Sequence, residues 1–206
     1  MYIPKPFRME EQETLYAFIE QNSFGILISA PSSSASPSVL QASHLPFLLQ
    51  PEKHCLTSHL ARGNDQWREL EGQEVLVIFQ GPHHYISPSW YGTNAAVPTW
   101  NYTAVHVYGR VEMLDDGAMF PMLQELVNTY EEPSSVYRLD ESNEELVTGL
   151  LQGIVGFNIR ISRIEGQWKL SQNHSRERQE RVIQGLRGAP NEQAASLAAL
   201  MQGNLK

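Results

Sequence analysis

The sequence has 206 residues, of which 41% are hydrophobic and 18% are charged, and its formal net charge is -8 at pH 7. This length suits one globular domain, or one domain with an appendage, and the composition excludes wholesale disorder. The acidic balance excludes a protein whose whole surface neutralises DNA phosphates, so DNA contact would require a local basic patch.

The chain contains no apolar run of membrane-spanning length, and its opening residues, MYIPKPF, lack the apolar core of a signal peptide. Its one cysteine, Cys55, cannot form an internal disulfide, which fits a reducing compartment. We therefore expect a cytoplasmic protein that does not contact membranes. Cys55 lies between His54 and Leu56, and we expect it to be a buried structural thiol and not a nucleophile.

The first predicted element is a helix over residues 10–21, in which Leu15, Phe18 and Ile19 share one face at helical spacing. Acidic residues crowd its first turn, where the helix dipole favours negative charge. A short apolar strand is predicted next, over residues 24–29.

A serine- and proline-rich segment over residues 31–38 is predicted to be a hairpin loop, because it joins the first strand to a second strand-like run at 39–42. Residues 75–79 are apolar at every position, which predicts a strand covered on both faces. Glu71-Gly72 before this run and Gly81-Pro82 after it are turn signals that predict its two ends.

Two later strands alternate between apolar and polar residues. In the first, over residues 105–113, one side carries Val105, Val107, Val111 and Met113, and the other carries His106, Tyr108, Arg110 and Glu112. In the second, over residues 155–161, one side carries Val155, Phe157, Ile159 and Ile161, and the other carries Gly156, Asn158 and Arg160. Each strand should therefore pack one face on the core and present the other to solvent, a partner subunit or a ligand.

Apolar residues at helical spacing predict helices over residues 118–130, 144–151 and 175–188, and an alanine-rich helix follows Gly188-Ala189-Pro190. The domain boundary is placed at this break, with the main domain over residues 1–188 and a helical tail over 189–206. Strands mixed with a few helices favour an α+β, mainly β, barrel over a doubly wound sheet. The sequence also lacks the glycine-rich motifs of dinucleotide-binding and P-loop folds.

Polar aromatic residues concentrate in segments 43–47, 59–67, 81–91 and 97–102, which together hold three of the four tryptophans. Large rings beside hydroxyls and amides suit a planar heteroaromatic ligand, because rings stack on it while a few donors fix its orientation. A phosphate on such a ligand would require cations or hydroxyls, and the candidates are Arg62, Lys169, Ser87 and Ser171. The alternative is that these prolines and tryptophans only pack the loops down.

Seven histidines raise the question of a metal or haem site. Against a metal, the sequence has neither an HExxH nor a paired CxxC motif, and the neighbours His83 and His84 would point to opposite faces of a strand. Ser87 and Ser89 flank Pro88, which indicates a rigid turn and not an activated nucleophile, and no GxSxG motif is present. We therefore predict no metal ligands and no catalytic residues.

Several motifs, in order along the chain, resemble the PaiB-type family of FMN-binding negative transcriptional regulators. They are the opening MYIPKPF, residues 44–47 (HLPF), 59–64 (HLARGN), 80–91 (QGPHHYISPSWY), 98–102 (PTWNY), 105–109 (VHVYG) and 169–173 (KLSQN). The string at 82–90 is the most specific of them. One departure is His174, at a position where the family motif favours Arg.

The resemblance implies an FMN-binding split β-barrel of the pyridoxamine-oxidase-like superfamily, and a homodimer with two flavin sites at its interface. It further implies that Arg62 and Lys169 serve the flavin phosphate. The residues implied on the ring or ribityl side are Trp90, Trp100, Asn101 and the strand that contains His44, Leu45, Pro46 and Phe47. Further candidates are His59, Asn64, Tyr85, Ser87, Ser171 and Gln172.

The resemblance makes a flavin-binding regulatory protein the first functional hypothesis. The most basic segment, residues 169–188, combines five cations with Glu177 and Glu180, which is more typical of a solvated helix with internal ion pairs than of a DNA-reading helix. We therefore expect an indirect route to transcription, or weak and salt-dependent DNA contact. A flavin-dependent oxidoreductase is the second hypothesis, because one fold can host several functions. A haem- or metal-binding relative is the third.

Overall fold

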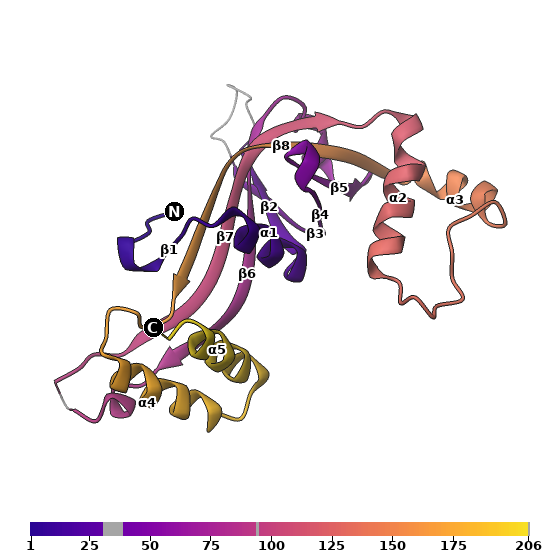
Figure 1. Ribbon diagram of the computed structural model, residues 1–206. Coiled ribbons are helices and arrows are strands. Elements are labelled where there is room, and N and C mark those ends of the chain that lie inside the picture. The colour runs from indigo at the N-terminus through magenta and orange to yellow at the C-terminus, as the bar shows by residue number, and fades with distance from the viewer. Residues whose placement is uncertain (31–38, 94, 206) are drawn as a thin grey trace. The chain divides into compact units, whose positions relative to one another are not determined.

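The computed structural model describes residues 1–30, 39–93 and 95–205. Its strands form one sheet in the order β3-β2-β6-β7-β8-β5-β4, and β1 pairs with β8 (Figure 1). The strands are β1 (Arg8–Met9), β2 (Phe24–Ser29), β3 (Gln41–Pro46), β4 (Leu48–Gln50), β5 (Cys55–Ala61), β6 (Glu74–Ile86), β7 (Thr99–Met113) and β8 (Ile154–Lys169). The helices are α1 (Gln12–Gln21), α2 (Asp116–Tyr130), α3 (Glu144–Leu151), α4 (Arg176–Arg187) and α5 (Glu192–Gly203). The predicted hairpin loop at 31–38 lies outside the described residues.

The chain divides into two compact units, and the long strands β6, β7 and β8 pass through both. Unit 1 comprises Met1–Asn22, Phe79–His106 and Ile164–Lys206, and unit 2 comprises Ser23–Ile78 and Val107–Arg163. The strand pairs whose register is given are antiparallel, and helices accompany the sheet in both units. This arrangement confirms the predicted α+β, mainly β, class.

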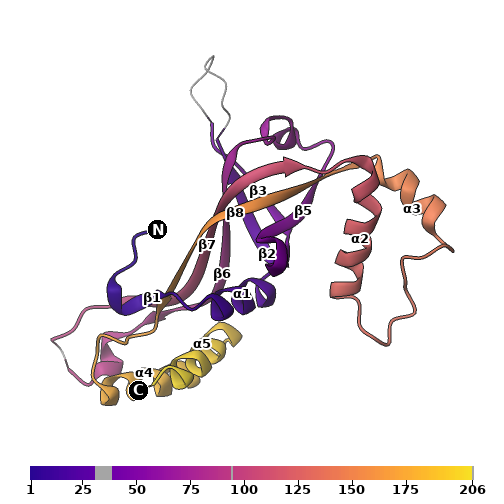
Figure 2. The ribbon, with the colours of Figure 1, turned by 45° about the horizontal axis from the view of Figure 1, so that its top comes forward.

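Unit 2 is built on two strand pairings. Strand β2 pairs with β3 from Phe24↔Pro46 to Ser29↔Gln41, and β5 pairs with β8 from Cys55↔Arg160 to Ala61↔Ile154. The core consists of fully buried side chains, among them Leu27, Leu56, Val77, Phe157 and Ile159. Cys55 is 6% exposed, and burial raises the pKa of its thiol, which confirms a buried thiol. Helices α2 and α3 lie side by side (Figure 2).

Unit 1 contains a close contact between α1 and the sheet. The Phe18 ring lies over Gly81, where an added Cβ would come within 2.8 Å of the ring and would also overlap Thr103 Oγ1. The same ring packs on Trp168, with ring centroids 4.9 Å apart. Helix α1 can sit this close to β6 because residue 81 has no side chain.

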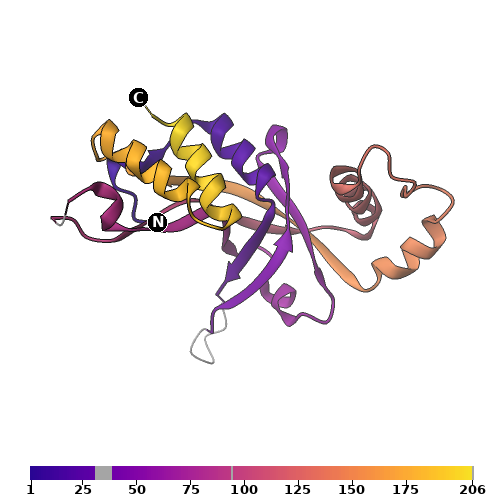
Figure 3. The ribbon, with the colours of Figure 1, turned by 90° about the horizontal axis from the view of Figure 1, so that it is seen from below.

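Helices α4 and α5 lie side by side in unit 1 (Figure 3). Ser175 caps α4, and Val182, Ile183 and Leu186 are its buried residues, so the helix predicted at 175–188 is confirmed. The predicted alanine-rich helix is α5, which buries Ala194, Leu197, Ala198 and Met201. Among the described residues, no helix is both long enough and apolar enough to cross a membrane.

Several boundaries differ from the predicted ones. The strand at 24–29 and the helix at 144–151 are confirmed to the residue. Strand β7 begins six residues earlier than predicted, and β8 begins one residue earlier and ends eight residues later than predicted. The prediction that Gly81-Pro82 ends the strand at 75–79 is wrong, because β6 continues to Ile86. Glycine lets α1 approach the sheet at this point, so its role is close packing and not a turn.

Helix α2 buries a different side from the one that spacing predicts. Its buried residues are Met119 and Met122, whereas the predicted stripe of Phe120, Leu123, Leu126 and Val127 is half-buried. Met119 also lies over Gly156, where an added Cβ would come within 2.6 Å of Met119 Sδ. The missing side chain on β8 therefore decides which residues of α2 contact the sheet.

Candidate functional site

The predicted site residues divide between the two units. Unit 2 contains His44, Leu45, Pro46, His59, Arg62 and Asn64. Unit 1 contains Tyr85, Ser87, Trp90, Trp100, Asn101, Lys169, Ser171 and Gln172. The two predicted phosphate ligands are Arg62 in unit 2 and Lys169 in unit 1, and neither has a carboxylate partner among the described residues.

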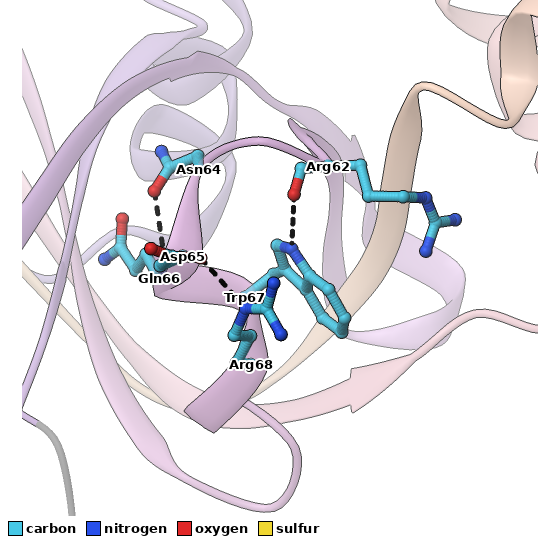
Figure 4. Close-up of polar contacts among 6 residues, drawn as sticks. All are labelled: Arg62, Asn64, Asp65, Gln66, Trp67 and Arg68. Atoms are coloured by element: carbon cyan, nitrogen blue, oxygen red, sulfur yellow. Dashed lines mark hydrogen bonds and ion pairs between the residues drawn. The ribbon is translucent and has the colours of Figure 1, made fainter.

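In unit 2, Asn64 anchors the loop that follows β5 (Figure 4). Its Oδ1 accepts a hydrogen bond from the Gln66 amide at 3.1 Å, and its Nδ2 donates to Ser43 Oγ at 2.8 Å. Ser43 Oγ in turn donates to Gln66 Oε1 at 2.6 Å, and the buried Gln66 side chain also donates to Ser29. This network fixes the loop on β2 and β3, so the backbone around Arg62 is held in place.

Arg62 is exposed and hydrogen-bonded to neutral groups only. Its Nε and Nη2 donate to the carbonyl oxygens of Gln152 and Ile154, at 2.7 and 3.0 Å. Its guanidinium carbon lies 5.8 Å from the centroid of the Trp67 ring, whose indole N–H donates to the Arg62 carbonyl (Figure 4). Among the described residues, no carboxylate forms an ion pair with Arg62, whereas the neighbouring Arg68 pairs with Asp65. The guanidinium group of Arg62 is therefore available to form an ion pair with an anionic ligand.

The two histidines of unit 2 have different surroundings. His44 is exposed on β3 and stacks on Phe24, with ring centroids 6.2 Å apart. His59 lies opposite Gly156 in the β5–β8 pair, and its Nδ1 is buried with no hydrogen-bond partner in the described part of the chain. Burial lowers the pKa of His59, because the imidazolium loses hydration there. We therefore expect His59 to be neutral in the folded protein.

The lowered pKa of His59 predicts a loss of stability on acidification. The unfolded chain takes up a proton near pH 6.5, whereas the folded chain resists it, so the free energy of unfolding falls as the pH drops below 6.5. We expect His59→Gln to have a shallower acid decline in urea denaturation series. The matched control is His44→Gln, which removes an exposed histidine. Equal declines in the parent and in His59→Gln would contradict this prediction.

Unit 1 offers two features that suit a flavin, exposed aromatic rings on β6 and β7 and a cation on β8. Trp100 is 53% exposed and Tyr85 is 42% exposed, and their rings meet edge to face with centroids 6.1 Å apart. His83 also contacts Trp100 at 6.3 Å. Lys169 Nζ donates to Thr99 Oγ1 at 2.5 Å, directly beside Trp100 in the chain. Lys169 is thereby joined to β7 at the residue that precedes Trp100. Because successive residues of a strand point to opposite faces, the Lys169–Thr99 pair and the Tyr85–Trp100 ring pair are two separate features of unit 1.

The charge of Lys169 is poorly compensated. Its one hydrogen-bond partner among the described residues is the neutral Thr99 hydroxyl, and burial lowers the pKa of its ammonium. A neighbouring phosphate would raise that pKa again, because opposite charge favours the charged form. Thr99 is the partner of Lys169, and sequence reasoning missed it although it directly precedes the predicted Trp100.

Other predicted residues of unit 1 are engaged inside the fold. Asn101 is fully buried, and its Nδ2 donates to Ser171 Oγ at 2.9 Å and contacts Met201 Sδ at 3.4 Å. The Gln172 side chain bonds the backbone of Trp168 and Leu170. These three residues join β7, the end of β8 and α5, so they support the surface that carries Lys169.

The segment around Trp90 packs against α4. Ser87 accepts a hydrogen bond from the Ser89 amide and begins the short 3-10 helix Pro88–Tyr91. The Trp90 ring lies over Gly185, where an added Cβ would come within 2.7 Å of three ring atoms. The same ring stacks on His84, with centroids 6.2 Å apart. Within the described residues, no group of three His, Cys, Asp or Glu side chains could hold a metal ion.

Comparisons with known proteins agree with this fold. Residues 1–163 match the model of a family described as "Putative FMN-binding domain". The chain is 39% identical over 210 residues to the protease synthase and sporulation protein PAI 2 of Bacillus subtilis (strain 168), with 100% of this chain and 99% of the relative covered.

Two solved structures share the fold at low sequence identity. One is the FAD and heme binding protein from Mycobacterium smegmatis, which is 14% identical with a TM-score of 0.57 and covers 79% of this chain and 73% of its own. The other is the flavocytochrome Anf3 from Azotobacter vinelandii, which is 13% identical with a TM-score of 0.55 and covers 79% of this chain and 69% of its own. Both confirm the split-barrel architecture.

Proposed function

Because this chain belongs to the PaiB-type family of FMN-binding-domain proteins, we propose that it is a homodimeric regulatory flavoprotein whose FMN lies where two copies meet. In this proposal the protein acts on transcription through its flavin state and its partners, without a DNA-reading helix of its own.

The observations that carry the proposal are the Lys169–Thr99 pair and the exposed ring pair of Trp100 and Tyr85, all in unit 1. Lys169 and Thr99 offer a charge and a hydroxyl to the phosphate, while Trp100 and Tyr85 offer open ring faces to a flat heterocycle. The donor set therefore fits FMN. When bound, FMN supplies a ring system that accepts and donates electrons, and these residues bind and orient it.

The exposed rings also favour a dimer. Large aromatic side chains gathered on an open surface are typical of interfaces, because water solvates them poorly. Trp100 and Tyr85 are each more than two-fifths exposed, and His83 extends the same surface. A second copy of the chain would cover this surface and exclude water from the flavin.

The absence of a DNA-reading helix is argued from the ion pairs of α4. Arg176 pairs with Glu180 at 2.9 Å and Arg181 pairs with Glu177 at 2.6 Å, each one helical turn apart. Arg181 also donates to the Tyr91 carbonyl oxygen. These arginines are engaged on the helix itself, and α5 contains no basic residue to accompany them.

The test is flavin content and oligomeric state of the purified protein. We expect a visible flavin absorption band, FMN identified by mass in a ratio of one per chain, and a dimer in analytical ultracentrifugation. A stable monomer that does not retain added FMN would refute the proposal. Nanomolar sequence-specific DNA binding by the dimer at physiological salt would refute the indirect route to transcription.

A flavin-dependent oxidoreductase is the second candidate. It is favoured by the solvent exposure of the Trp100 and Tyr85 rings. Trp100 and Tyr85 leave room for a donor molecule to approach a flavin placed against them. This candidate predicts that the FMN-loaded protein oxidises NADH or NADPH faster than the same concentration of free FMN. Equal rates would count against it.

A further inference from the structure

The segment between β7 and β8 carries all of the chain's net negative charge. Residues 114–151 form α2, α3 and the loop between them in unit 2, and they contain nine carboxylates and one cation, Arg138. The whole chain contains 23 carboxylates and 15 cations, so the remainder contains 14 of each and is formally neutral. We call residues 114–151 the acidic segment (Figure 1).

The negative charge of the acidic segment is not neutralised inside the fold. All nine carboxylates belong to exposed residues, and none of them forms an ion pair with another described residue. The hydrogen bonds that some of them accept come from neutral groups, such as the Gln50 amide on Glu125. Arg138 donates to three carbonyl oxygens of the loop that precedes it. The carboxylates are therefore available to positive charge from outside the chain.

Helix α3 of the acidic segment also has apolar residues on its solvent side. Val147 is buried, whereas Leu146 and Leu150 are 68% and 67% exposed. These two leucines lie four residues apart, so they share one face of the helix. Tyr137 in the preceding loop is 44% exposed. A helix needs one apolar stripe to pack on its own unit, and a second, exposed stripe is typical of a surface that binds another protein.

The charge of the acidic segment restricts what can cover this stripe. Anionic lipid surfaces and nucleic acids are repelled by it. A second copy of the chain offers no net positive charge, because the remainder of the chain is formally neutral. No group of three His, Cys, Asp or Glu side chains in the described part of the chain could hold a metal ion. The complementary surface is a protein segment that combines cations with apolar side chains.

We propose that the acidic segment is the docking surface for a basic amphipathic helix of a partner protein. The apolar side chains of that helix contact Leu146 and Leu150, and its Lys and Arg side chains face the surrounding carboxylates. The surface itself requires neither FMN nor a dimer. Its regulatory role rests on the proposed function, for which it names the kind of partner through which a regulator without a DNA-reading helix acts.

The test is a fluorescence anisotropy titration of the purified full chain with a labelled basic amphipathic peptide, LKKLLKLLKKLLKL. We expect saturable binding of one peptide per chain, and the affinity should fall as salt is added, because salt screens exposed charges. The acidic counterpart, LEELLELLEELLEL, should not bind. Binding of the acidic peptide with similar affinity would overturn the proposal.

The apolar part of the surface is tested by the double variant Leu146→Ala, Leu150→Ala. It should weaken binding of the basic peptide by at least about tenfold, because each leucine loses the apolar area that the peptide covers. Both side chains are exposed, so folding should be preserved. The matched control is Val39→Ala, Leu40→Ala, which truncates two exposed apolar residues of unit 2 outside the acidic segment. Equal affinities in the two double variants would contradict the assignment.

The charged part is tested by Glu144→Gln, Glu145→Gln. This variant should weaken binding by about tenfold at low salt, and the difference should vanish at high salt, which loss of helix structure alone does not explain. The control is Glu52→Gln, Glu69→Gln, which changes the net charge equally through exposed residues of unit 2 outside the acidic segment. An equal loss of affinity in this control would overturn the proposal.

Two further measurements separate this inference from its alternatives. Analytical ultracentrifugation of Leu146→Ala, Leu150→Ala should give the same oligomeric state as the parent, whereas dissociation of a dimer would show that a second copy covers the stripe and would overturn the proposal. Flavin content is measured in the same samples. A protein that binds the basic peptide at Leu146 and Leu150 but retains no FMN would support the docking surface and refute the flavin proposal, so the two failures are distinguishable.

Discussion

Replacing Lys169 by Gln is expected to weaken FMN binding by about 10- to 100-fold, with little change in folding stability. A hydrogen bond between a cation and a phosphate contributes roughly 1.5–3 kcal/mol when it is removed from water, which corresponds to this range. Lys169 is half-buried and its partner in the described structure is the neutral Thr99 hydroxyl, so no internal ion pair is lost in the variant. The measurement is the FMN dissociation constant from flavin fluorescence quenching.

The matched control for this variant is Lys53→Gln. Lys53 is exposed in the short 3-10 helix Pro51–Lys53, and its replacement changes the net charge by the same amount. Thr99→Val gives an intermediate case, because it removes the hydroxyl but keeps the ammonium. The site assignment is wrong if Lys169→Gln and Lys53→Gln retain FMN equally well.

Phe18→Ala is expected to lower the free energy of unfolding by about 3 kcal/mol, near the low end for a buried aromatic residue. The ring covers Gly81 and packs on Trp168, but it also lines an open pocket with Met9 and Leu200, where water can enter the space left behind. Chemical denaturation followed by circular dichroism measures the change. A loss below 1 kcal/mol would show that α1 contributes little to unit 1.

Gly81→Ala tests the same contact from the sheet side. The added methyl group overlaps the Phe18 ring and Thr103, and overpacking of this kind costs about 1–3 kcal/mol. In the Phe18→Ala background the methyl group has room, so the cost should shrink. A double-mutant cycle with additive effects would contradict the close contact between Phe18 and residue 81.

Local patterns in the sequence were sufficient to predict most of the helices and strands. The apolar run 24–29 and the helix 144–151 have the predicted bounds, because each is specified by its own neighbours. The strands β6, β7 and β8 are longer than predicted. The added segments of β6 and β7 contain Gly81, Pro82 and Asn101, which strand propensity disfavours, and packing from α1 and α5 keeps them in the sheet.

The residue types of the candidate site can be read from the sequence, whereas their contacts cannot. Arg62 and Lys169 are cations that suit a phosphate, the family resemblance adds Trp100 and Tyr85, and each of the four is accessible to some degree in its unit. For other candidates, the spacing of residues in the sequence cannot reveal whether a polar side chain is already hydrogen-bonded inside the fold. Asn101, for example, donates a hydrogen bond to Ser171 inside the fold, although the two residues lie 70 positions apart in the chain.

Local periodicity and motifs taken in order are enough to predict the mainly β fold class, the family and the residue types that suit a flavin. The folded chain was needed to learn which cations lack a carboxylate and which rings remain open. It was also needed to find the two pockets that Met9, Trp168 and Asn204 line together. These properties depend on contacts between residues far apart in the chain, and the free energy of such contacts has no signature in local sequence.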